Sequence, residues 1–141
     1  MGKNRNRNNN QKQQRYTGKN VDHFGDPMRM ERHALDVFRD MSRGKYNFNY
    51  LNEFMNNDFV YAAIRVAQKN IRRHDIVASA LSYAYGASND PDVISLRNQE
   101  NAILTGWTFI HSSFCGFTGT GDLGSLMGMA QWLSNNREIR L

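Results

Sequence analysis

Two residues four positions apart have the spacing of a reactive pair. On a helix His111 and Cys115 would share a face, as half of a metal site or as a thiol–imidazole pair. The other three histidines stand alone in the sequence, so no second pair of ligands completes a metal site. We therefore favour a buried cysteine beside a half-buried histidine, and we predict no metal and no cofactor.

The segment 119–124, GTGDLG, matches the G-x-G-x-x-G pattern of dinucleotide-binding sites. Such a site needs a strand before the glycines, and a helix and a returning strand after them. Only 17 residues follow Gly124, which is too few for both elements. The Gly-Lys-Ser/Thr ending of a phosphate-binding P-loop is also absent. We interpret this segment as a turn.

No group of residues has the pattern of a catalytic site. Asp36 and Asp40 would share a helix face, but three nearby arginines favour ion pairs along the helix instead. No serine lies in the G-x-S-x-G context of a nucleophile elbow. The sequence thus predicts a protein that is not an enzyme and has no small-molecule substrate.

Cations are concentrated in the first twenty residues. This stretch carries a charge of +6 and no acid, whereas the rest of the chain carries −1. Residues 1–24 form a basic arm with too little apolar surface to offset the entropy of ordering it alone. We expect it to be disordered or ordered by a partner, either nucleic-acid phosphate or a neighbouring subunit; a solvated tail is the alternative. The candidate binding residues are Lys3, Arg5, Arg7, Lys12, Arg15 and Lys19.

A second cationic cluster consists of Lys69, Arg72 and Arg73, followed by His74. It is a candidate for a second contact with nucleic acid or a partner. The alternative is a solvated helix end, where cations interact favourably with the helix dipole.

The first predicted helix spans residues 27–43. Asp26 and Pro27 provide a cap and a first-turn proline, and Gly44 is placed to end the helix. Its apolar residues recur on one face at helical spacing. These residues are Met30, Ala34, Val37, Phe38 and Met41. A connector over 45–49 and a short helical piece over 50–56 follow.

Helical periodicity continues from 58 to 85, with Asn57 or Asp58 as the cap and Gly86 as the stop. The segment is either one kinked helix or two helices, the second starting at Asp75. One apolar face is predicted in each half. The faces are Phe59, Ala62, Ala63, Val66 and Ala67, and then Val77, Ala80, Leu81 and Ala84.

Asn89-Asp90-Pro91 repeats the start signal ahead of the longest apolar seam, which predicts a central helix over residues 91–114. The seam consists of Val93, Leu96, Glu100, Ile103, Trp107, Ile110 and Phe114. A strand over 107–117 is the alternative, because this part is rich in aromatic and β-branched residues.

A glycine-rich interruption follows at 116–128, and Asp122 or Ser125 can cap a last helix. Trp107 and Trp132 are expected in the core or an interface, and residues 135–141 are expected to fray. The sequence therefore predicts an all-α domain over 25–141, a small bundle of about four to five helices behind the basic arm.

These features favour a structural or assembly component of a large particle, bound to other subunits and to the phosphate backbone of nucleic acid. No run of about 18 apolar residues and no secretory signal is present, so we expect no membrane contact. The Asn-rich composition, the modest charge and the lack of a transit peptide favour a phage or viral virion protein, located in the virion or host cytoplasm. The alternatives are a small helical DNA- or RNA-binding regulator and a ribosomal-type RNA-associated protein.

Overall fold

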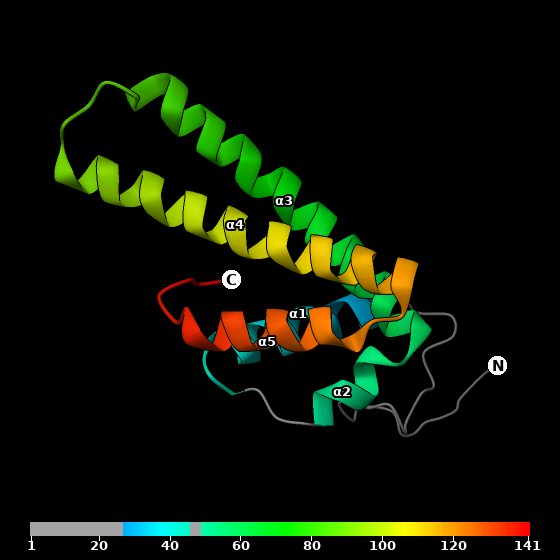
Figure 1. The fold of residues 1–141 in the computed structure, drawn as a ribbon. Coiled ribbons are helices and arrows are strands. Elements are labelled where there is room, and N and C mark those ends of the chain that lie inside the picture. The colour runs from blue at the N-terminus through cyan, green and yellow to red at the C-terminus, as the bar shows by residue number, and fades with distance from the viewer. Residues whose placement is uncertain (1–26, 46–48) are drawn as a thin grey trace.

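The computed structural model describes residues 27–45 and 49–141, and these form five helices and no strand. The predicted all-α bundle is therefore confirmed. The basic arm and the proposed cap at Asp26 lie outside the described residues. Figure 1 shows the helices α1 (Pro27–Ser42), α2 (Asn49–Phe54), α3 (Asn57–Tyr85), α4 (Pro91–Thr120) and α5 (Leu123–Asn135).

Helix α1 forms as its pattern predicts. All five apolar residues of its predicted face are buried. After Ser42 the backbone turns left-handed at Gly44, with φ 78°. The Gly44 N–H donates to the Met41 carbonyl at 2.9 Å, which satisfies one of the free carbonyls at the helix end.

Helix α3 is one continuous helix of 29 residues, and Asp75 lies within it. Its cap is Asn56 rather than Asn57 or Asp58, so that prediction was wrong. The Asn56 carboxamide oxygen accepts from the backbone N–H of Asp58 at 2.9 Å, because Asn56 is the residue with extended backbone. The helix ends at Tyr85, directly before Gly86, as predicted.

Helix α4 begins at the predicted cap, where the Asp90 carboxylate accepts from the Asp92 N–H at 2.9 Å. It then runs to Thr120, beyond the predicted end at 114, and 107–117 is helical. The glycine-rich interruption over 116–128 was therefore too long. Only residues 121–122 separate α4 from α5, because Gly121 adopts a left-handed φ of 69° and Asp122 caps α5.

An aromatic core joins α1, α3 and the second half of α4. Phe38 lies at its centre, with its ring centroid 6.0 Å from that of Trp107 and 5.7 Å from that of Phe114. Both contacts are edge-to-face, the geometry that aromatic pairs favour. Trp107 is fully buried, which confirms its predicted place in the core.

The predicted seam of α4 is buried only in its second half. The first buried residue of α4 is Gly106, Val93 is half-buried, and Leu96 is 47% exposed. On α3 the last buried residue is Ala67. The reason is length: α1 and α5 have 16 and 13 residues, against 29 and 30 in α3 and α4. The far halves of α3 and α4 consequently extend past the core as a two-helix hairpin (Figure 1).

Residues 135–141 do not all fray, which corrects the prediction for this segment. Ile139 and Leu141 are buried, and the chain returns between α4 and α5 (Figure 1). A Cβ placed on Gly106 would lie 3.1 Å from the Leu141 Cδ2 atom. The missing side chain of Gly106 thus leaves the space that this segment fills.

Candidate partner-binding surface

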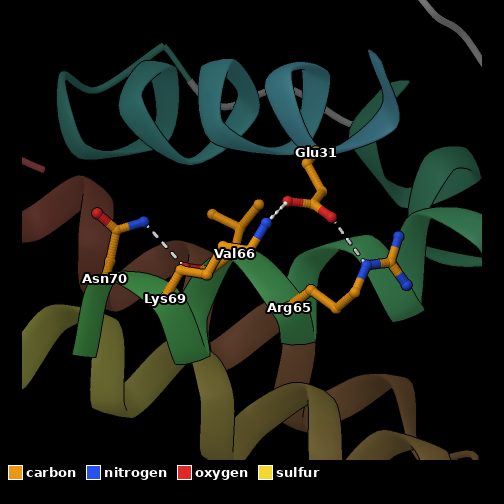
Figure 2. Close-up of polar contacts among 5 residues, drawn as sticks. All are labelled: Glu31, Arg65, Val66, Lys69 and Asn70. Carbon is orange, nitrogen blue, oxygen red and sulfur yellow. Dashed lines mark hydrogen bonds and ion pairs between the residues drawn. The ribbon is translucent and has the colours of Figure 1, made fainter. Parts of the chain in front are cut away.

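Lys69, a predicted binding residue, belongs to an ion-pair network that fixes α1 on α3 (Figure 2). Its Nζ donates to Glu31 Oε1 at 2.7 Å, and Arg65 Nε donates to Glu31 Oε2 at 2.9 Å. The Glu31 side chain is only 9% exposed, whereas those of Lys69 and Arg65 are 51% and 41% exposed. Lys69 therefore neutralises a carboxylate of its own chain, and its ammonium is not a free cation.

The two cations also set the ionisation of Glu31. Burial by itself would raise the pKa of the Glu31 carboxyl. The hydrogen bonds and charges of Lys69 and Arg65 outweigh that effect together and hold the pKa below its ordinary value. The carboxylate is therefore charged whenever α1 is docked at neutral pH.

The rest of the predicted cluster has two different roles. Arg72 and Arg73 are exposed, and no hydrogen bond or ion pair joins either side chain to the part of the chain that is described. His74 instead faces α4, where its Nδ1 lies 2.8 Å from Glu100 Oε1. Two free cations thus remain on the outer surface of α3, at the base of the hairpin. The six predicted binding residues of the arm lie outside the described residues.

Beyond Arg73 the same face of α3 becomes apolar. We call this surface the outer stripe, and its members are Ile76, Val77, Ala80, Tyr83 and Ala84. They follow one another at one-, three- and four-residue steps, so they share a helix face. Tyr83 is 95% exposed, Ile76 69% and Val77 40%. The outer stripe is an apolar helix face that the described residues leave uncovered.

Part of this surface was predicted as an apolar helix face, without a partner-binding role. Val77, Ala80 and Ala84 are exposed, and within that predicted face Leu81 alone is half-buried. The helical spacing was read correctly as one face. It could not show that the last buried residue of α3 is Ala67.

The remaining candidates show no chemical site. Cys115 is exposed, contrary to the prediction, and its Sγ lies 3.7 Å from His111 Nε2. Within residues 27–45 and 49–141 no three His, Cys, Asp or Glu side chains are grouped to hold a metal ion. The GTGDLG segment forms the end of α4, the turn at Gly121 and the cap of α5.

A shallow groove of about 590 Å³ lies between α4 and α5. Phe109 and Trp132 form its apolar wall, with ring centroids 5.0 Å apart and nearly perpendicular planes. Trp132 is thus half-buried at the surface. The groove's other lining residues are Leu104, Thr105, Thr108 and Ser112, and none of the six titrates near neutral pH.

No family model, no curated protein and no solved structure matches the chain. No helix among the described residues has the length and apolar character to cross a membrane.

Proposed function

We propose that the protein is a non-enzymatic structural or assembly component of a large particle, of the kind found in phage or viral virions. Its helical body docks on other subunits through the hairpin. Its basic arm contacts nucleic acid or a neighbouring subunit. The observation that carries this proposal is the outer stripe, an apolar helix face on a hairpin that extends beyond the core.

Two physical arguments support an assembly role. Apolar surface removed from water contributes about 25 cal/mol per Å², so the outer stripe gains stability when a partner covers it. Contiguous apolar patches on soluble monomers are usually small, and larger ones mark interaction sites. The +6 charge of the first twenty residues adds a segment suited to phosphate or to an acidic surface.

The exposed face of α3 also favours this role over that of a groove-reading regulator. A recognition helix presents cationic and amide side chains to base edges and phosphates. On α3, Arg72 and Arg73 are followed by the apolar outer stripe, which suits a protein partner better than a nucleic-acid groove. A ribosomal-type RNA-associated protein would bind phosphate through such an arm equally well.

Sedimentation velocity of the natively purified chain tests the proposal. We expect species larger than the 16.3 kDa chain, with nucleic acid copurifying at low salt. The double variant Ile76→Arg/Tyr83→Arg should lower the assembled fraction strongly. Met127→Arg is the matched control, because Met127 is 42% exposed but lies on α5, away from the outer stripe. A chain that stays monomeric up to about millimolar concentration, free of nucleic acid, would contradict an assembly role.

A further inference from the structure

We propose that the partner of the outer stripe is a second copy of this chain, packed antiparallel around a two-fold axis that passes near Ala80. The inference rests on the proposed function and names the partner in it. The hairpins of the two copies would together form one four-helix arrangement between the two bodies. The order of charges and of side-chain sizes along the hairpin favours such a pair.

The net charges at the two ends of the hairpin have opposite sign. Arg72 and Arg73 are exposed at the base together with Asp75, and Asp90 and Asp92 are exposed at the tip, where Arg97 Nη1 donates to the Tyr85 carbonyl. Ala80 lies seven residues from Arg73, about 10 Å along a helix. On the other side of Ala80, α3 ends at Tyr85, five residues further on, and the tip with Asp90 follows. An antiparallel pair therefore places the arginines of each copy opposite the carboxylates of the other, whereas a parallel pair would place like charges together.

The side-chain sizes along the outer stripe fit the same symmetry. A two-fold axis at Ala80 pairs it with its own copy, and two methyl side chains let the helices approach closely. The axis then pairs Ile76 of each copy with Ala84 of the other, so a large side chain faces a small one. It also pairs Val77 with Tyr83, whose ring can lie along the hairpin surface. The residues of each pair are the same number of positions from Ala80.

Five side chains per copy make a small interface, below the size typical of permanent dimers. The pairing is therefore weak in the isolated chain and strengthened in a particle, where many copies are held together. Such a contact is best detected by covalent capture. For an interface of this size we expect a dissociation constant in the micromolar range or weaker, on the order of 1–100 µM.

Disulfide capture tests the two-fold axis directly. The background is the full chain with Cys115→Ser, since Cys115 is exposed and would cross-link by itself. Ala80→Cys should form a covalent dimer on mild oxidation, because residues on a two-fold axis meet their own copies within disulfide reach. Asn98→Cys is the matched control, an exposed position on α4. By helical spacing it is turned away from the residues of α4 that face α3. Absence of a dimer from the Ala80→Cys chain, or equal capture by Asn98→Cys, overturns the inference.

Charge exchange tests the antiparallel register. Arg73→Glu and Asp92→Arg should each raise the dissociation constant about tenfold in sedimentation equilibrium. The double variant restores opposite charges across the interface and should return to within about threefold of the parent. Failure of the double variant to recover, with its helical circular dichroism intact, overturns the register. A chain that assembles without Ala80→Cys capture would retain the assembly role and exclude the second copy as partner. Capture without larger assemblies would instead contradict the assembly role alone.

Discussion

Trp107 shows how one residue can anchor the core while leaving a polar group unpaired. Its side chain is fully buried against Phe38, yet its indole Nε1 has no hydrogen-bond partner among the described residues. We predict that Trp107→Ala lowers the free energy of unfolding by roughly 3–5 kcal/mol, as large-to-small aromatic changes do. Trp107→Phe should lower it far less, because it keeps the ring contact and removes an unpaired N–H whose burial costs about 1–3 kcal/mol.

Urea unfolding followed by circular dichroism measures both variants, with the denaturant slope as a check that the transition stays two-state. Equal destabilisation by the two substitutions would show that the indole nitrogen has a partner.

Single residues were predictable where the signal lies within one helix. The buried face of α1 follows from its spacing alone. The hydrogen bond between His33 Nε2 and Glu53 Oε1 does not, since it joins buried residues of α1 and α2 that are 20 positions apart. The same holds for the Glu31 network, where the partners are 34 and 38 positions apart. Spacing within one helix carries no information on such pairs.

At the scale of the helices, the type of each element was predictable and its coverage was not. Apolar periodicity is a property of one helix, and it continues through Leu96 and Ala80. Burial depends on which other helices cover that face, and both residues are exposed in the described chain. The outer stripe was therefore missed as a site because its sequence resembles a core face. Caps such as Asp90 were found because capping is local.

The attachment of α1 to α3 should depend on pH through Glu31. Its pKa is lower in the folded chain than its ordinary value of 4.5, so ionisation favours the folded state. This stability is present above pH 4.5 and is lost as the pH falls through the folded pKa. Glu31→Gln should lower the free energy of unfolding at pH 7 by about 1 kcal/mol, a value reduced for the exposure of its two partners.

The measurement is urea unfolding of the parent and of Glu31→Gln at pH 7 and at about pH 3, with Asp36→Gln as the control. Asp36 is an exposed acid on the same helix. The difference between parent and Glu31→Gln should shrink at the lower pH. A difference that stays constant with pH would mean that the side chain acts by packing and not by charge.

At the scale of the whole molecule, charge and apolar surface are segregated. The first twenty residues carry +6 and the remainder −1, while the outer stripe lies on the hairpin. The sequence is enough to predict the all-α class, because helical periodicity and capping are local properties of the chain. It cannot identify the partner of either surface, since that depends on a second molecule.

The basic arm carries six cations and no acid in its first twenty residues. If most of its six cations lie on phosphates, binding to duplex DNA should fall with salt at a log–log slope of about −4 to −5. Affinity should depend little on base sequence, because phosphate contacts position a protein without reading bases.

Replacing Arg5, Arg7 and Arg15 with Gln should reduce the magnitude of the slope by about three units and leave the unfolding of residues 25–141 unchanged. Arg72→Gln/Arg73→Gln is the matched control, because it removes two exposed cations outside the arm; an unchanged slope assigns the phosphate contacts to the arm. Fluorescence anisotropy on labelled duplexes of two unrelated sequences, from about 50 to 200 mM salt, measures each slope. Binding that is insensitive to salt, or strongly selective for one duplex, would exclude phosphate as the partner of the arm and favour the helical regulator.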